Sequence, residues 1–310
     1  MTTVPTTQPT ATSAPWLQNN NLLGFFFMLP AAVFLVCFLT YPLGLGVWLG
    51  FTDTRIGRDG VFIGLENYVF LAGDKVFWLA VFNTLFYTLI ASILKFALGL
   101  WLALLLNENL PCKSFFRAIV LLPWVVPTVL SALAFWWIYD AQFSIISWSL
   151  MQLGVIESPI NFLGDPTNAR ASVIAANVWR GIPFVAISLL AGLQTIPASL
   201  QEAASLDGAT SWQRFRYVTL PMLTPIIAVV MTFSVLFTFT DFQLIYVLTK
   251  GGPVNATHLM ATLSFQRGIP GGQLGEGAAI AVAMIPFLLA SILFSFFGLQ
   301  RRKWQQGGAD

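Results

Sequence analysis

The chain alternates long apolar runs with shorter polar segments. A helix that crosses a bilayer needs about 20 mostly apolar residues, and six runs reach that length. They are residues 23–51, 77–106, 118–139, 172–193, 222–248 and 277–299. Three of these runs contain no charged residue, and the other three contain only Lys95, Arg180 or Asp241. The pattern predicts an all-α integral membrane protein with six transmembrane helices.

The two ends of the chain differ from the region between them. Residues 1–22 are rich in Thr, Pro and Ala, which is typical of a disordered tail. The first apolar run has no basic residue before it and is too long for a cleaved signal peptide, so we interpret it as a retained span. Residues 300–310 form a basic C-terminal tail. Residues 23–299 are therefore expected to form the membrane domain.

The distribution of basic residues predicts the orientation. Six spans place both termini on one side, and Lys and Arg favour cytoplasmic loops. With cytoplasmic termini the inner segments contain seven basic residues and the outer segments six. The basic residues closest to span ends are Arg117 and the cluster at 301–303. Both lie on the inner side in this arrangement, which favours cytoplasmic N- and C-termini.

A polar segment between the fourth and fifth runs has clear helix signals. Residues 202–215 read EAASLDGATSWQRF. Asp207 and Gly208 form a turn signal, and Thr210 stands three residues before Gln213, the spacing of a capping box. We expect two short helices within residues 197–221, with the second ending near Thr219 before the fifth span begins. From the residues alone, an ordinary connecting loop and a docking element both remain open.

Composition narrows the class of protein. The chain is 57% hydrophobic and only 9% charged, whereas soluble domains carry about 25% charged residues. The net charge of +2 is too small to indicate a nucleic-acid partner. The two cysteines, Cys37 in an apolar run and Cys112 in a polar connection, are expected to be free thiols.

Several kinds of chemistry have no signature in the sequence. No lysine follows a glycine, so the phosphate-binding GK[ST] loop of an ATPase is missing. The single histidine, His258, lies in an outer segment and is expected to be a solvated surface residue. No Cys/His cluster indicates a metal site. We therefore expect no catalytic residue, no metal and no cofactor in this chain, and we do not interpret it as an enzyme.

The charged residues within the spans are the strongest local signals of function. Polar groups in a membrane usually face a partner or a water-filled cavity. For Arg180 and Asp241, contact with a solute and a mutual ion pair are equally open. We expect Lys95 to snorkel or to meet a neighbouring helix. Trp136 and Trp137 are expected to belong to an interfacial aromatic belt.

Several motifs in order carry a family resemblance. The run EAASLDGATSWQRFRYVTLPMLTP at 202–225 closely resembles the cytoplasmic loop of permease subunits of binding-protein-dependent ABC importers, of the carbohydrate-uptake, maltose permease type. The other motifs are ENYVF at 66–70, FFRAIVLLPWVVP at 115–127, NVWRGIPF at 177–184 and LIYVLTKGGP at 244–253. The resemblance extends over about residues 22–303.

The resemblance implies an assembly in the bacterial cytoplasmic (inner) membrane. In that family the loop is a coupling helix that docks in a cleft of a separate ATPase, which binds the ATP and Mg²⁺. The expected partners are a second homologous permease, an ATPase dimer and an extracytoplasmic solute-binding protein, which the outer segments 52–76, 140–171 and 249–276 are long enough to receive. The implied coupling residues are Glu202, Ala203, Ala204, Asp207 and Gly208.

The resemblance also implies an alternating-access path for a sugar-type solute among the third, fourth and fifth spans. The matching positions are Trp124, Thr128, Asn177, Arg180, Gly181, Phe184, Thr238, Thr240 and Asp241. Sugars bind aromatic faces through their C–H surfaces and bind amides, hydroxyls and charges through their OH groups. The family often has uncharged residues near Arg180 and Asp241, so the charges here indicate a strongly polar or ionic group on the solute.

Three alternatives stay open at this point. The first is an importer of an anionic sugar derivative or polyol phosphate in place of a neutral oligosaccharide. The second is a secondary transporter driven by an ion gradient, which needs buried acids or unwound spans; Asp241 is the one acid that a span supplies. The third is a membrane enzyme or assembly factor without a transported solute, which the scarcity of His, Cys and clustered acids disfavours.

Overall fold

A computed structural model describes residues 20–109 and 111–305 of the chain. Within these ranges the protein is helical, and strand pairing is limited to two isolated bridges. The predicted all-α membrane class is confirmed. Of the two tails expected from the sequence, residues 1–19 and 306–310 lie outside the described residues. The first helix begins at Asn20 and the last ends at Gln305.

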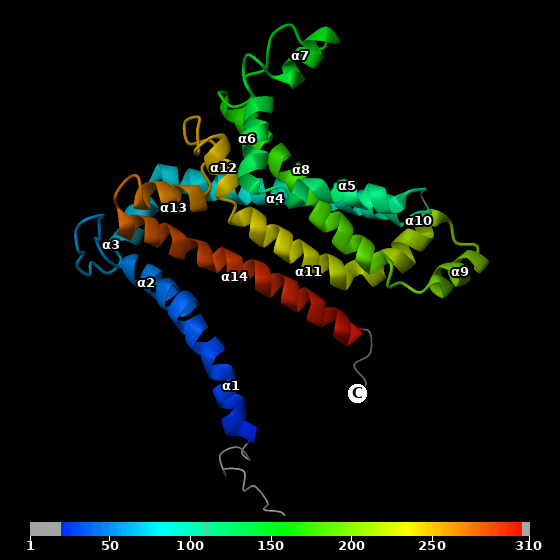
Figure 1. Cartoon of the computed structure of the whole chain (residues 1–310), viewed down its shortest axis with the longest axis horizontal. Helices are drawn as coiled ribbons and strands as arrows, with labels where there is room; N and C mark the ends of the chain where they lie inside the picture. Colours follow the sequence, from blue (N-terminus) through cyan, green and yellow to red (C-terminus); the bar gives the residue numbers. More distant parts are fainter. Residues whose placement is uncertain (1–19, 110, 306–310) are drawn as a thin grey trace, which may run out of the picture.

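The elements follow one another with short connections. In chain order they are α1 (Asn20–Leu35), a π-helical turn (Val36–Thr40), α2 (Tyr41–Leu49), α3 (Glu66–Gly73), α4 (Lys75–Asn107), α5 (Lys113–Val125), α6 (Thr128–Ile138), α7 (Ile145–Gln152), α8 (Pro166–Leu193), α9 (Ala198–Leu206), α10 (Ser211–Arg214), a second π-helical turn (Phe215–Thr219), α11 (Leu220–Phe239), α12 (Gln243–Leu248), α13 (Met260–Gly268) and α14 (Leu274–Gln305). Helices α4, α8, α11 and α14 pack together along the long axis of the molecule (Figure 1). The short helices α3 and α13 lie at one end of this axis, and α9 and α10 lie at the other (Figure 1).

The apolar runs become five helices long enough to span a membrane, or six if a broken pair is counted as one span. The broken pair is α5 and α6, which meet at 89°. The prediction of one continuous third span over 118–139 is therefore wrong. Val126 is extended because Pro127, which follows it, disfavours helical backbone in the preceding residue and has no N–H to continue the helix.

The fifth span also differs from its prediction at both ends. The second helix of the polar segment does not stop near Thr219. It continues through the π-helical turn into α11, and that turn ends just before Leu220 and Pro221. Pro221 has no N–H to donate to the preceding turn, and a wider turn at this point accommodates the loss. Beyond Phe239 the helix breaks before α12 begins at Gln243.

Close approach of helix backbones sets the packing at the centre. On α4, a Cβ atom at Gly99 would lie 2.7 Å from Cγ1 of Val185 on α8, so only glycine allows this contact. Around it, a buried cluster joins α4, α8 and α11 and includes Leu189 and Leu223. Small residues at such contacts let membrane helices approach closely and gain van der Waals energy. The segment Asn21–Leu49, in contrast, buries none of its most apolar stretch within this chain.

The segment between α12 and α13 folds back onto α4. Asn83 Nδ2 donates to the backbone oxygens of Asn255 and His258, each at 3.1 Å, and Thr84 Oγ1 accepts from the backbone of Met260 at 2.8 Å. His258 is 3% exposed, and its Nδ1 lies 3.2 Å from Oγ1 of Thr262. The prediction that His258 is a solvated surface residue is therefore wrong, because the polar groups of α4 hold this segment down.

Burial gives His258 a pH-dependent role in stability. Desolvation lowers the pKa of the imidazole from its ordinary 6.5 and is the largest effect; a hydrogen bond with Gln266 raises the pKa in part, and the nearby Arg267 adds a smaller lowering effect. As the pH falls, His258 is therefore protonated in the unfolded chain at a higher pH than in the folded protein. The stability that neutral His258 contributes is present above pH 6.5 and is lost as the pH falls through the lower pKa of the folded state.

We expect the thermal stability of the purified protein in detergent to fall between about pH 7 and about pH 5, and to fall less in His258→Gln. Glutamine is neutral throughout this range and of similar size. Differential scanning fluorimetry of both proteins over the same buffers measures the two slopes. Equal slopes in the two proteins would contradict the role given to His258.

Candidate functional site

A central cavity of about 530 Å³ lies where the broken third span and the break in the fifth span meet α4 and α8. It is lined by Lys95, Trp124, Thr128, Asn177, Arg180, Gly181, Phe184, Ser234, Phe237, Thr238, Thr240, Asp241, Phe242 and Gln243. All nine positions that the sequence assigned to a solute path are on this wall. The structure thus brings together residues that are up to 117 positions apart, from Trp124 to Asp241.

Asp241 occupies the break between α11 and α12 and is held from two other helices. Its Oδ2 accepts from the hydroxyl of Tyr87 on α4 at 2.8 Å and from Nδ2 of Asn177 on α8 at 2.9 Å. Its Oδ1 has only a long contact of 3.4 Å with the backbone N of Leu244. Irregular backbone at membrane depth occurs where it lines a cavity, and here it turns a carboxylate toward one.

Arg180 does not pair with Asp241. Among the ion pairs of the described residues, none joins these two side chains. The guanidinium of Arg180 instead lies over the ring of Trp124, 5.5 Å from its centroid. Such a cation–π contact holds the charge without neutralising it. The mutual ion pair that the sequence left open is therefore not formed, and both charges remain on the cavity wall.

An aromatic cluster forms the apolar side of the cavity. Trp124 stacks on Phe184 with ring centroids 5.1 Å apart and an interplanar angle of 23°. Phe237 meets Trp124 at 6.3 Å and Phe184 at 6.1 Å. The bend after Val125 is what places Trp124 against α8 and α11. The cluster offers flat apolar surface next to the charged groups.

Two polar atoms of the cavity residues have no hydrogen-bond partner in the described structure. They are Oδ1 of Asn177 and Nε of Arg180, and both are buried. Leaving a buried polar atom unpaired costs about 1–3 kcal/mol, so each such atom calls for an explanation, and a bound ligand or water is one. Oδ1 accepts and Nε donates, so together they suit a hydroxyl-bearing ligand.

Sequence reasoning missed two residues of the site, both on α4. Tyr87 binds Asp241, and Lys95 lines the cavity with its Nζ donating to Oγ1 of Thr238. The prediction that Lys95 meets a neighbouring helix is correct, and this contact lies in the wall of the cavity. Tyr87 and Lys95 are eight residues apart and share a helix face with Ala91 and Gly99. That stripe of small residues was the available signal.

Other aromatic residues lie outside this site. Trp179 is 44% exposed and packs against Phe135. Trp136 and Trp137 are 46% and 66% exposed. Their placement on the surface is compatible with an aromatic belt. Within the described ranges, no group of three His, Cys, Asp or Glu side chains is arranged to hold a metal ion.

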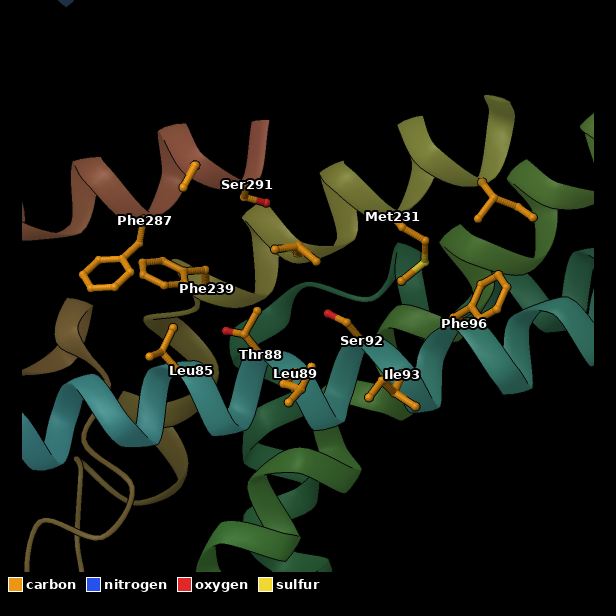
Figure 2. A pocket seen from close by; sticks show the side chains of 13 residues that line it. Leu85, Thr88, Leu89, Ser92, Ile93, Phe96, Met231, Phe239, Phe287 and Ser291 are labelled. Atoms are coloured by element: carbon orange, nitrogen blue, oxygen red, sulfur yellow. The ribbon is translucent and has the colours of Figure 1, made fainter. Parts of the chain in front are cut away.

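A second, lateral cavity of about 490 Å³ lies between α4, α11 and α14. Figure 2 shows Leu89 and Ile93 of α4 facing Met231 of α11, with Phe239 and Phe287 stacked at one end. Its lining contains hydroxyls but no charged residue. The buried hydroxyls of Thr88 and Ser92 in this lining also have no partner among the described residues. The rest of the lining is nearly all apolar and has no aromatic wall beside charged groups, so the central cavity is the candidate solute site.

The polar hairpin, residues 198–214, lies at the end of the molecule opposite α3 and α13 (Figure 1). Helix α9 ends at Leu206, and Gly208 has φ = +80°, a conformation that favours glycine. The predicted capping box is present: Thr210 and Gln213 each bind the other's backbone N–H. The first predicted short helix, the turn and the start of the second helix at Ser211 are confirmed, whereas the second helix continues into α11.

The implied coupling residues form an outward-facing surface on this hairpin. Glu202, Ala203, Asp207 and Gly208 are exposed, and Ala204 is half-buried. Two large apolar side chains are exposed beside them, Leu206 at 89% and Trp212 at 69%. Sequence reasoning did not single out these two. Large exposed apolar side chains on one surface are compatible with a site that binds another protein.

Hydrogen bonds brace α9 against the start of the fifth span. Gln201 Nε2 donates to Oγ1 of Thr219 at 3.0 Å, and Arg214 Nη1 donates to Oγ of Ser205 at 2.9 Å. Arg214 Nη2 also binds Oγ of Ser211 at 3.3 Å. The brace ties the first helix of the hairpin to the segment that continues into α11.

Comparison with known proteins agrees with this geometry. The family model described as "Binding-protein-dependent transport system inner membrane component" matches residues 95–306. The trehalose/maltose transport system permease protein MalF of Thermococcus litoralis is 36% identical over 282 residues, which cover 90% of this chain and 95% of that protein. The sulfoquinovosyl glycerol transport system permease protein SmoG of Agrobacterium fabrum is 35% identical, with 87% and 88% covered.

A solved structure has the same fold over nearly the whole chain. It is a chain of a bacterial ABC transporter involved in the import of the acidic polysaccharide alginate, with a TM-score of 0.80 and 25% identity. The match covers 92% of this chain and 98% of that chain. The protein therefore belongs to the family of binding-protein-dependent transport system inner membrane components, the multi-pass permease subunits of ABC importers.

Proposed function

We propose that this chain forms, with a second homologous permease, the alternating-access path of a sugar importer. Transport is driven by ATP hydrolysis on two separate ATPase subunits, which bind the ATP and Mg²⁺. An extracytoplasmic binding protein delivers the solute. The observation that carries the proposal is the central cavity, where an aromatic wall stands beside unpartnered polar atoms. The family description and the relatives named for sugar transport support it.

The cavity offers both kinds of contact that a sugar needs. The stacked rings of Trp124 and Phe184 present an apolar face to the C–H surface of a pyranose. Oδ1 of Asn177 accepts a hydrogen bond from a hydroxyl, and Nε of Arg180 donates one. Oδ1 of Asp241, with only one long protein contact, accepts a further bond. The remaining residues of the path shape the space around these groups.

A neutral sugar is the solute class we favour. The 36% identical relative is named for trehalose and maltose, and Asp241 disfavours an anion at its end of the cavity. An anionic sugar derivative ranks second. The break around Asp241 also meets one expectation for an ion-coupled transporter, but family membership favours ATP as the energy source.

Coupling is proposed to run through the hairpin. Glu202, Asp207 and the thin face at Ala203 and Ala204 dock in a cleft of the ATPase, and Gly208 provides the bend. Closure of the ATPases then moves the hairpin as a rigid body, and the state with the better ATPase contact gains population. Because the ATPase is cytoplasmic, this docking also places the N- and C-termini in the cytoplasm.

We expect Trp124→Ala and Asn177→Ala to reduce sugar uptake roughly tenfold or more, since losing about 1.4 kcal/mol of solute binding corresponds to a factor of ten. Trp124→Ala removes a stacking face, and Asn177→Ala removes both an acceptor and a donor to Asp241. Radiolabelled maltose or trehalose uptake into proteoliposomes that contain the whole importer measures the change. Trp137→Ala, on the exposed surface, is the matched control.

The same assay tests the solute class and the energy source. Unlabelled neutral disaccharides should compete for uptake, and uronic acids or sugar phosphates should not. Uptake should stop when the ATPase is inactivated. Competition by the anionic sugars alone would favour the second-ranked solute, and uptake that survives loss of the ATPase would refute the ABC mechanism.

We expect Gly208→Val and Glu202→Lys to abolish uptake and to uncouple ATP hydrolysis, while the binding protein still captures its solute. A side chain at the left-handed position of Gly208 costs about 1–2 kcal/mol and shifts the docking surface. Gly154→Val is the control, because Gly154 also has positive φ (+70° against +80°) and open space around it, but lies after α7. Normal coupling in Gly208→Val would remove the hairpin from the mechanism.

A further inference from the structure

Lys95 is a buried cation whose position the helix packing alone does not explain. It lies within α4, its side chain is 3% exposed, and it lines the central cavity. Its Nζ donates to Oγ1 of Thr238 on α11 at 2.5 Å. A lysine that snorkels extends to the membrane surface, but this one reaches a residue of the cavity wall. Lys95 therefore belongs to the site.

The hydrogen bonds around Lys95 leave part of its donor capacity unused. An ammonium group has three N–H donors, and the described residues supply one acceptor, the hydroxyl of Thr238. That hydroxyl gives its own proton to the carbonyl oxygen of Ser234 at 2.5 Å. Thr238 thus has no proton left for a ligand, whereas Lys95 has two. Unsatisfied charge in a membrane is costly, which favours a ligand or water in the cavity.

Gly181 provides the space that Lys95 occupies. A Cβ atom at Gly181 would lie 2.3 Å from Cδ of Lys95 and 3.4 Å from its Cγ and Cε. Gly181 has ordinary helical backbone angles, so backbone conformation does not require a glycine at this position. The lysine stem crosses α8 at this glycine. The resemblance assigned Gly181 to the solute path, and the space needed by Lys95 explains why a glycine stands there.

No ion pair accounts for Lys95 either. Asp241 is the acidic residue of the cavity lining. The ion pairs of the described residues do not include a pair between Lys95 and Asp241. Asp241 takes its hydrogen bonds from Tyr87 and Asn177. With Arg180, the lining therefore contains two fixed cations and one carboxylate. The donor side of the cavity is Lys95 and Arg180, and the acceptor side is Asp241 and Asn177.

We propose that Lys95 is a solute-binding, specificity-determining residue, and that Gly181 acts by making room for it. The free N–H groups of Lys95 bind hydroxyl or ring oxygens of the sugar and hold it in the cavity after the binding protein releases it. The inference rests on the proposed function and deepens it. It gives the second span, α4, a direct part in solute recognition, and it makes Thr238 a positioning residue for the ammonium.

The test is a double-mutant cycle of Lys95→Ala and Gly181→Ala in the complete importer in proteoliposomes. The readout is the number of maltose or trehalose molecules taken up per ATP hydrolysed, with loaded binding protein in excess. Lys95→Ala should lower this ratio at least tenfold, about 1.4 kcal/mol, because unheld solute escapes while the ATPases still turn over. Lys75→Ala, an exposed lysine at the start of the same helix, should leave the ratio unchanged.

The double variant separates the two roles. If Gly181 acts through Lys95, Gly181→Ala lowers the ratio in the parent and changes it less than about twofold in the Lys95→Ala background. An additive effect would show that Gly181 meets the solute directly, and an unchanged ratio in Lys95→Ala would remove Lys95 from the site. A parallel loss of uptake and of stimulated ATP hydrolysis in Lys95→Ala would show a structural role and overturn the proposal.

The failure of this inference is distinguishable from failure of the proposed function. If Trp124→Ala abolishes sugar uptake and Lys95→Ala leaves it intact, the cavity remains the solute path without Lys95. If no cavity variant affects sugar uptake, the proposed function fails, and the role of Lys95 fails with it. The amount of assembled complex in the membrane, measured by quantitative immunoblot for each variant, normalises every ratio.

Discussion

The structure depends on one constraint: a polar group within hydrocarbon must find its partner inside the protein or in a water-filled space. The helices meet this constraint for most of the backbone. Two spans break at membrane depth, at Val126–Pro127 and between Phe239 and Gln243. Residues at both breaks line the same cavity, Thr128 at the first and Asp241 at the second. The breaks and the cavity therefore depend on each other.

Glycines on α4 and α8 have two different roles where these helices pack together. At Gly99 the missing side chain admits Val185, and the two backbones approach closely. At Gly181, about three turns before the end of α8, the missing side chain admits a lysine stem. The first contact provides van der Waals energy, and the second delivers a charge to the cavity. Composition alone does not distinguish these roles, because both look like a small residue in an apolar helix.

Much of the fold was predictable because its signals are local. Span length follows from bilayer thickness, and the hairpin follows from Gly208 and the capping box at Thr210. The failures are contacts between distant segments. Pro127 disfavours a continuous helix, but the residues around it do not contain the 89° angle between α5 and α6, which pack against different helices, α8 and α12. His258 is buried because Asn83, 175 residues earlier in the chain, binds its backbone.

The candidate site shows the same division. The nine positions taken from the family resemblance do meet at one cavity. Residue spacing alone does not show that these positions come together, so the resemblance was needed to group them. Lys95 and Tyr87 were missed because their importance comes from contacts with Thr238 and Asp241 in another span, more than 140 residues away. A single charge in an apolar run gives no indication of the helix that it faces.

The fifth span connects the two functional surfaces within one continuous helical segment. From Ser211 it runs through the π-helical turn and α11 to the break at Thr240. Near its N-terminal end Thr219 receives the brace from Gln201, and near its C-terminal end Thr238 receives Lys95. A displacement of the hairpin therefore moves the wall that holds the lysine. Because the helix is stiff along this length, coupling needs no chain of small adjustments between the two sites.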